Sequence, residues 1–278
     1  MIKRERPECR VAVLVPLYKE SLLKSEEFSF RNTLALLSKH DIYVVCPDGL
    51  REYVSSLRKY FSCEFKSRFF PDQFFGSIAG YNKLLKSKLF YKSFDDYDYL
   101  LIVQTDALVF SDRLLEWCGR DYSYVGAPWF KGFDRPVNPL SFLGVGNGGF
   151  SLRKVSDFLR VLSYPRHIPN VMLADAINET EKYSVAKFIK HHLIFSYSFQ
   201  PLQPQTNEDY FWGALVPQRC EFFSVPEPED ALSFAFEVAP EYLYELNNRE
   251  LPFGCHAWEK YNLKFWRDAL SKRGIELP

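Results

Sequence analysis

The sequence lacks any apolar run near the ~20 residues that a membrane-spanning helix needs. Residues 1–10 are basic, but the apolar run that follows, Val11 to Leu17, is only of strand length and contains Pro16. No small-residue cleavage site follows this run. We therefore expect neither a signal peptide nor a membrane span.

The sequence also lacks an excess of charge, since 35 Lys and Arg balance 35 Asp and Glu. No overall field would attract nucleic acid or an anionic membrane, so binding must come from a local site. The six cysteines form neither a CxxC pair nor a zinc-like spacing, and several lie within apolar segments. Such cysteines are typical of buried free thiols in a reducing compartment, and we expect a cytoplasmic protein.

Apolar residues make up 47% and aromatic residues 17% of the chain, enough for a sizeable core. Val11–Tyr18 and Ile42–Gly49 read as buried strands that end in loops containing proline, and Phe28–Ser38 between them has apolar residues at helical spacing. Two strand–loop–helix units in succession predict an α/β fold with a mostly parallel sheet and covering helices.

A third buried strand is expected at Leu100–Val103, followed by Gln104-Thr105-Asp106. Ligands of parallel α/β sheets bind beyond the carboxyl ends of the strands, which is where Tyr18, Asp48 and Asp106 would lie. The structural alternative is that Asp106 forms a turn, as Asp often does after a strand.

Residues 144–149 contain four glycines. Such a segment indicates positive φ angles or a close approach to the backbone. It has the spacing of neither a P-loop nor a dinucleotide-binding loop. Two interpretations stay open: a structural turn, or a turn against which a flat sugar lies.

Two acids, Glu208 and Asp209, precede an aromatic run. Helix capping explains one of them but not readily both. His256 lies among Cys255, Phe253 and Trp258, where a histidine of the core is the structural alternative to a ligand. The stretch at about 170–200 resembles a helical insertion, whose residues 185–195 form either an amphipathic helix for a membrane or protein partner, or a plain surface helix.

Five segments occur in a fixed order: Gln104-Thr105-Asp106, Gly126-Ala127-Pro128-Trp129, residues 146–153, Asn207-Glu208-Asp209 and Phe253-Gly254-Cys255-His256. As a set they resemble the DUF5672 family, placed among the GT-A glycosyltransferases, over about residues 11–261. The resemblance implies a single-domain, GT-A-like (Rossmann-like) α/β fold. Residues 1–125 would form the half that binds the nucleotide-sugar donor, and residues 126–278 the half that binds the acceptor and carries catalysis.

The resemblance also implies a metal site. Gln104-Thr105-Asp106 falls where such families carry Asp-X-Asp, whose last carboxylate holds a divalent cation on the donor diphosphate. Asp106 matches that last position, whereas Gln104 replaces the first acid. Mn²⁺ or Mg²⁺ would be the cofactor, and Mn²⁺ also accepts an imidazole, which gives His256 a role as second ligand.

The remaining roles follow from the same resemblance. Asp209 would be the catalytic base of an inverting transfer, with Glu208 as its substitute or as an acceptor ligand. Without a metal, Arg153 or Lys83 would neutralise the diphosphate. The donor would contact Pro16, Leu17, Tyr18, Asp48, Lys83, Gln104, Thr105, Asp106 and Arg153. The sugars would contact Trp129, Asn147, Gly148 and Gly149.

The expected function is an inverting, metal-assisted glycosyltransferase that acts in cell-surface polysaccharide synthesis, with a UDP- or GDP-sugar donor and a glycan or lipid-linked glycan acceptor. We expect no nucleic-acid partner, and contact with the inner face of the membrane or with a partner protein through residues 185–195. The alternatives are a retaining transferase or nucleotidyltransferase on the same fold, and a carbohydrate- or nucleotide-sugar-binding module without turnover.

Overall fold

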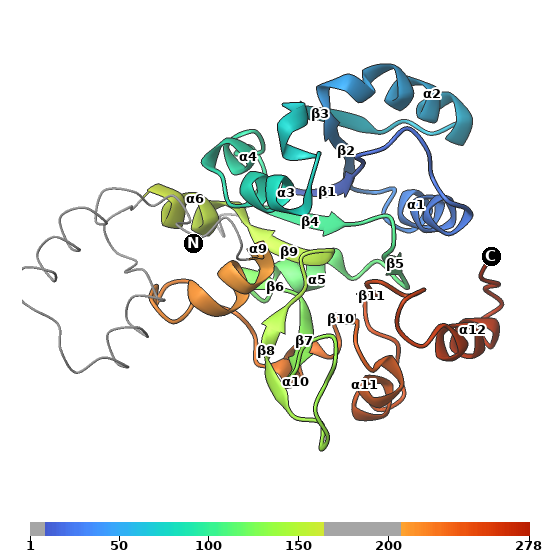
Figure 1. Ribbon diagram of the computed structural model, residues 1–278, viewed down its shortest axis with the longest axis vertical. Coiled ribbons are helices and arrows are strands. Elements are labelled where there is room, and N and C mark those ends of the chain that lie inside the picture. The colour runs from blue at the N-terminus through green and yellow to red at the C-terminus, as the bar shows by residue number, and fades with distance from the viewer. Residues whose placement is uncertain (1–8, 164–206) are drawn as a thin grey trace, which may run out of the picture.

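The computed structural model describes residues 9–163 and 207–278, which fold around one central sheet (Figure 1). The strand order is β3-β2-β1-β4-β9-β6. The first four strands are parallel, whereas β9 runs antiparallel to both β4 and β6. The predicted α/β class, with a mostly parallel sheet in a single domain, is confirmed. The strands are β1 (Val11–Pro16), β2 (Asp41–Pro47), β3 (Lys66–Phe70), β4 (Tyr99–Val103), β6 (Tyr124–Val125) and β9 (Phe150–Lys154).

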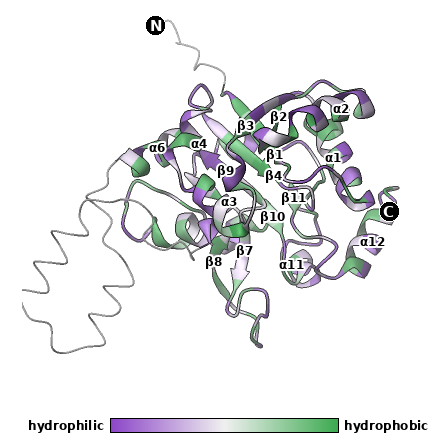
Figure 2. Cartoon of the chain, turned by 45° about the horizontal axis from the view of Figure 1, so that its top comes forward, coloured by the Kyte–Doolittle hydropathy of each residue, from purple (hydrophilic) through white to green (hydrophobic). Residues whose placement is uncertain are grey.

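The inner strands are apolar on both faces because helices cover both faces. Val13 and Leu101 point to one side, where α1 (Lys24–Leu36), α2 (Arg51–Phe61) and α5 (Leu114–Cys118) pack. Their neighbours Leu14 and Leu100 point to the other, toward α3 (Ile78–Leu85), α4 (Lys88–Lys92) and α6 (Val155–Ser163). Figure 2 shows the resulting apolar strands between helices of mixed polarity.

The C-terminal part adds a third core beside the sheet. There β10 (Ala235–Phe236), β11 (Gly254–Cys255) and β5 (Leu108–Val109) form a small sheet, and β7 (Ala127–Phe130) pairs with β8 (Phe142–Gly146). The pairing of β11 with β5 brings His256 back to the end of β4. The helical segments here are α9 (Glu208–Tyr210), η3 (Phe211–Leu215), α10 (Pro228–Ala231), α11 (Pro240–Leu246) and α12 (Leu263–Ser271); two short 3₁₀ turns, η1 (Asp48–Leu50) and η2 (Asp72–Phe74), lie earlier in the chain.

Some local features differ from what the sequence pattern predicts. The apolar spacing of residues 77–89 predicts one helix, but two form, because Ser77 caps α3 and Ser87 caps α4 with side-chain hydrogen bonds of 3.1 and 3.2 Å. Residues 122–129 read as one strand that runs into a loop, but the chain divides at Gly126 into β6 and β7, which belong to different sheets. Strand β3 was not expected, because its polar start is that of an edge strand. The predictions for about 170–200 lie outside the described residues.

All six cysteines are free, as expected. Within residues 9–163 and 207–278, no helix has both the length and the apolar character to cross a bilayer.

Candidate active site

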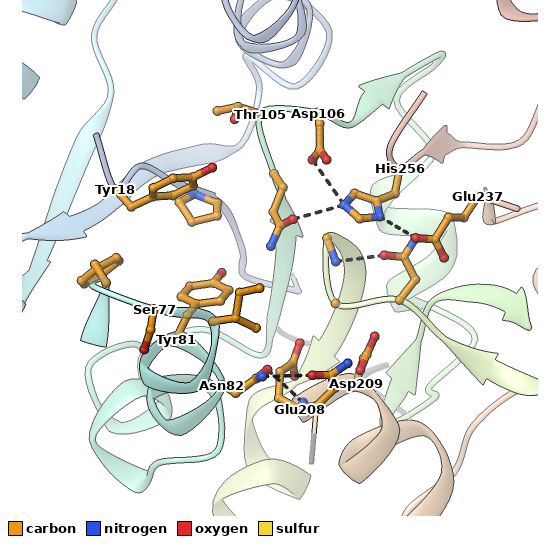
Figure 3. Close-up of a pocket in the computed structure, with 18 of the residues that line it drawn as sticks. Tyr18, Ser77, Tyr81, Asn82, Thr105, Asp106, Glu208, Asp209, Glu237 and His256 are labelled. Atoms are coloured by element: carbon orange, nitrogen blue, oxygen red, sulfur yellow. Dashed lines mark hydrogen bonds and ion pairs between the residues drawn. The ribbon is translucent and has the colours of Figure 1, made fainter. Parts of the chain in front are cut away.

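A cleft of about 570 Å³ opens at the carboxyl ends of β1 and β4. Its walls come from the start of α3, the turn between β8 and β9, the start of α9 and the ends of β10 and β11. In Figure 3, Tyr18, Ser77 and Tyr81 lie on one side, His256 and Glu237 on the other, and Asn82, Glu208 and Asp209 at the base. The two described parts of the chain therefore meet at the strand ends where a ligand was expected.

One wall carries a cluster around the imidazole of His256. Its Nε2 lies 3.2 Å from Asp106 Oδ1 and 3.1 Å from Gln104 Oε1. Its Nδ1 lies 2.9 Å from Glu237 Oε1. The side chain of Asp106 is 43% exposed and that of His256 only 15%, so the carboxylate faces the cleft while the ring stands behind it.

The two carboxylates control the charge of His256. Burial lowers the pKa of the imidazole, but Asp106 and Glu237 outweigh this and raise the pKa to about 10. Burial likewise raises the pKa of Asp106, but His256 outweighs it, and that pKa lies below its usual value. Without a cation, the two carboxylates therefore keep both ring nitrogens of His256 protonated, and a metal ion bound at Nε2 would displace the proton there.

This cluster fits a divalent cation. Ligands at about 2.1 Å and at right angles in an octahedral shell are about 3 Å apart, close to the spacing of Asp106 Oδ1 and His256 Nε2. Gln104 Oε1 brings a second oxygen to the same nitrogen. A metal-bound histidine commonly gives its other ring N–H to a carboxylate, as Glu237 allows here. No group of three or more His, Cys, Asp and Glu with metal-ligand placement exists within the described residues, so a bound cation would need further ligands from the substrate.

The glycine-rich turn brings two side chains of the site against the backbone. A Cβ on Gly149 would lie 2.0 Å from His256 Nε2, and one on Gly148 would lie 2.1 Å from Glu208 Oε1. Gln104 donates its backbone N–H to the carbonyl of Gly149 at 2.8 Å, which ties the turn to the end of β4. Glycine is therefore required at both positions because the imidazole of His256 and the carboxylate of Glu208 approach the backbone closely. These side chains, and not a sugar, occupy the space that a Cβ would fill.

The two acids at the start of α9, Glu208 and Asp209, have different surroundings. Glu208 is 3% exposed, and its Oε1 accepts a 2.8 Å hydrogen bond from Nη2 of the fully buried Arg153. Asn82 of α3 accepts the backbone N–H of Glu208 at 3.0 Å and donates to Asn207 Oδ1 at 3.2 Å. These contacts fix α9 against the N-terminal half.

Asp209 has no ion pair within the part of the chain that the structure describes. Burial, and next the nearby charge of Glu208, raise the pKa of Asp209 to about 6. The backbone N–H groups of Tyr210 and Gly148 oppose this rise but do not cancel it. A carboxylate that changes charge near neutral pH suits a general base.

The opposite wall is aromatic and exposed. Tyr18 is 59% and Ile78 79% exposed at the mouth of the cleft. Glu26 also lines the cleft, 7% exposed, and its Oε2 accepts from Lys19 at 2.9 Å and from the N–H of Leu23 at 2.7 Å. This side offers flat apolar surface rather than charge.

The structure brings together most of the predicted site residues. Those that line the cleft are Pro16, Tyr18, Gln104, Thr105, Asp106, Asn147, Gly148, Gly149, Glu208, Asp209 and His256.

The other five predicted residues do not line the cleft. Leu17 is buried in the core, and Asp48 pairs with Arg51 on the surface. Lys83 is exposed outside the cleft. Trp129 is 7% exposed and stacks on Tyr210, and Arg153 is buried behind Glu208. Donor contacts for four of them, and a sugar contact for Trp129, therefore have no support from geometry.

Nine of the described residues that line the cleft were not predicted, and four of them have polar side chains that matter here: Glu26, Tyr81, Asn82 and Glu237. Glu237 follows a strand of only two residues, and Asn82 occupies an ordinary helical position. Their partners lie 19 residues away for Glu237 and 125 and 126 residues away for Asn82, so no local pattern marks them.

Comparison with known proteins gives a family and several related folds. The model of a family described as "Protein of unknown function (DUF5672)" matches residues 64–256, a range that contains all five motifs. No curated protein matches.

Among solved structures, mouse xyloside xylosyltransferase 1 is 10% identical over 89% of this chain and 97% of its own, with a TM-score of 0.48. The glycosyltransferase GlyE of Streptococcus pneumoniae is 14% identical over 97% of this chain and 65% of its own, with a TM-score of 0.43. Core-mannan synthase A of Aspergillus fumigatus, in its Mn/GDP form, is 10% identical over 55% of this chain and 61% of its own, with a TM-score of 0.39.

Proposed function

We propose a function from one premise: this chain belongs to the DUF5672 family, whose model matches residues 64–256. The proposed function is a glycosyltransferase that moves a sugar from a nucleotide-sugar donor to a hydroxyl group of a glycan or glycoconjugate. One observation carries the proposal. A single cleft places the cation-attracting cluster of Asp106 and His256 on its wall and the unpaired carboxylate of Asp209, with a pKa of about 6, at its base.

The donor would lie along the strand ends. Tyr18 and Ile78 give the nucleobase an apolar surface at the mouth of the cleft. The diphosphate would reach Asp106, where Gln104 Oε1, Asp106 Oδ1 and His256 Nε2 would hold the Mn²⁺ or Mg²⁺ that accompanies it. Bound there, the cation would neutralise the charge that grows on the diphosphate as it leaves. Within the described residues no Lys or Arg lines the cleft, so this chain needs such a counter-charge.

The acceptor would react from the base of the cleft. Asp209 removes the proton from the acceptor hydroxyl, whose oxygen forms the new bond to the anomeric carbon. The bond from that carbon to the diphosphate oxygen breaks, and its electron pair leaves with the nucleoside diphosphate. One base on the side opposite the leaving group gives inversion. Glu208 is not proposed as the base, because Arg153 holds one of its oxygens.

A carbohydrate-binding module without turnover is the second candidate, favoured by Gln104 in place of an acid. Measuring donor hydrolysis over a panel of UDP- and GDP-sugars, with and without Mn²⁺, separates the two. Turnover of one donor that requires the cation supports the enzyme. Tight donor binding without turnover of any donor would leave only the binding module.

We further propose a cytoplasmic location, which the six free cysteines support. A role in cell-surface polysaccharide synthesis, with a lipid-linked acceptor reached from the inner face of the membrane, is part of the same proposal. Cell fractionation with an antibody to the chain tests it, because recovery outside the cytoplasmic and inner-membrane fractions would contradict it.

A further inference from the structure

Two polar atoms of residues that line the cleft have no hydrogen-bond partner. They are the amide nitrogen Nδ2 of Asn147 and the carboxylate oxygen Oε2 of Glu208. The residues are 2% and 3% exposed. An unpaired buried donor or acceptor destabilises the fold, so native proteins rarely keep one without a use. One donor and one acceptor left over in the same cleft point to a ligand that supplies both.

The free end of Asn147 is fixed by the turn that contains it. Asn147 Oδ1 accepts the backbone N–H of Gly149 at 3.0 Å, which identifies the oxygen and leaves the nitrogen as the unused end. The residue has a φ of 80°, a left-handed conformation that asparagine tolerates better than most residues. The amide is therefore held in one orientation with its two N–H donors unused.

The free oxygen of Glu208 is fixed equally firmly. Arg153 takes Oε1 at 2.8 Å and Asn82 holds the backbone N–H of the same residue. The carboxylate lies against Gly148, the residue next to Asn147, since a Cβ there would be 2.1 Å from Oε1. Because Arg153 occupies Oε1, Oε2 is the oxygen left to accept a hydrogen bond from a ligand.

We propose that Asn147 and Glu208 form a subsite for one neutral sugar ring of the acceptor, in which Glu208 Oε2 accepts from one hydroxyl and Asn147 Nδ2 donates to another. The inference rests on the proposed function and names its acceptor class. Asp209 follows Glu208 directly and is affected by its charge, so one ring would present a hydroxyl to each of the two carboxylates. A uronic acid or a phosphorylated sugar is disfavoured, because its charge would face Glu208 and Asp209 with no Lys or Arg among the described lining residues.

Binding of simple glycosides tests the subsite without turnover. The probes are the methyl pyranosides of glucose, galactose, mannose and xylose, titrated by ligand-observed NMR against the full chain with UDP and Mn²⁺ present. Asn147→Asp keeps the size of the side chain and the acceptor for Gly149, but replaces the free donor by an acceptor. We expect it to weaken the best glycoside about tenfold, the usual effect of one lost hydrogen bond, and to leave the affinity for UDP unchanged. Asn248→Asp is the matched control, since Asn248 also has a positive φ, 55°, but lies outside the cleft.

Glu208→Gln tests the acceptor atom, but it also leaves Arg153 without its buried carboxylate. Monodeoxy forms of the best glycoside on the unaltered protein therefore supply an independent test. The form without the hydroxyl that Glu208 binds should bind about tenfold more weakly, and it should lose nothing further in Glu208→Gln. Glu245→Gln is the control, because Glu245 also pairs with an arginine, Arg249, at 2.8 Å but on the surface.

The outcomes separate this inference from the proposed function. Equal glycoside affinity in Asn147→Asp and in the unaltered protein, full affinity of every monodeoxy form, or binding of UDP but of no glycoside would each overturn the subsite. If a glycoside binds as described but no nucleotide sugar is bound or turned over, the subsite stands and the proposed function fails.

Discussion

Glu208 and Asp209 are consecutive acids at the base of one cleft, and within the described residues only Glu208 forms an ion pair. Glu208 Oε1 lies 2.8 Å from Arg153, whereas no ion pair reaches Asp209 from the described part of the chain. Burial and the neighbouring charge of Glu208 raise the pKa of Asp209 to about 6, which suits a carboxyl group that takes up and releases a proton near neutral pH. The difference between the two acids arises from the fold, which buries them beside Gly148, and not from the dipeptide itself.

Replacing the titrating acid should abolish transfer. Asp209→Asn removes the proton acceptor but keeps the volume, so we expect transfer to fall by at least ~10²-fold. Donor affinity should stay within about twofold, because Asp209 lies at the base of the cleft and is not part of the cation cluster on its wall. The measurement is steady-state transfer together with titration of UDP and Mn²⁺. Asp230→Asn, an exposed aspartate outside the cleft, is the control, and unchanged transfer in Asp209→Asn would refute the role of base.

The pH dependence of transfer should report the same group. A base works only when ionised, and the pKa of Asp209 is about 6 because burial and Glu208 raise it. The kcat/KM for transfer should therefore rise about tenfold per pH unit below pH 6 and level off above about pH 7. In Asp209→Asn the residual rate should lack this limb. A profile that levels off near pH 4 in the unaltered protein would contradict the assignment.

The stability contributed by Asp209 should fall with rising pH, whereas the rate of transfer should rise. The pKa of Asp209 is raised from 3.8 to about 6 by folding, so the folded state binds the proton more tightly than the unfolded chain. The free energy of unfolding contributed by this group therefore falls as pH rises between about 4 and 6, by roughly 3 kcal/mol at most. Asp209→Asn should raise the melting temperature at pH 8 and have little effect at pH 4. Calorimetric scans at the two pH values measure this, and equal effects at both would argue against a raised pKa.

The inner strands and the site motifs could largely be predicted from the sequence, because each is marked by a pattern of neighbouring residues. The inner strands β1, β2 and β4 are apolar runs, and Gln104 to Asp106 follow directly after one of them. The alternation of each strand between two cores explains why continuous runs, rather than alternating ones, marked the sheet.

The contacts between side chains that lie far apart in the sequence could not be predicted from the sequence. The family resemblance implied that Arg153 meets the donor, but its strand β9 lies between β4 and β6 and places it fully buried against Glu208. Trp129 was expected to stack on a sugar, yet its ring occupies the space that a side chain on Gly146 would fill. Glu237 reaches His256 only because β10 and β11 are adjacent. Each case depends on strand order, which composition and spacing do not encode.

The carboxylate behind His256 should control cation affinity. Glu237 Oε1 lies 2.9 Å from Nδ1 and sets which ring nitrogen stays free for a metal. We expect Glu237→Gln to weaken Mn²⁺ binding about 10–100-fold and His256→Ala to weaken it further. Titration of Mn²⁺ by electron paramagnetic resonance, with UDP present, measures both. His40→Ala is the control, since His40 forms a similar contact of 3.0 Å with Asp112 outside the cleft. Equal Mn²⁺ affinity in His256→Ala and the unaltered protein would exclude ligation.

Arg153 should act on stability rather than on donor binding. Arg153→Met leaves Glu208 as a buried charge without a partner, a change that typically costs about 3–5 kcal/mol of unfolding free energy. The double variant Arg153→Met with Glu208→Leu removes both charges and should recover most of that loss, because an apolar pair avoids the desolvation that the ion pair requires. Urea unfolding of the single and double variants gives the coupling energy. Affinity for UDP with Mn²⁺ should be the same in the double variant as in the unaltered protein. A loss of UDP affinity above tenfold in a variant that remains folded would show that Arg153 contributes to donor binding.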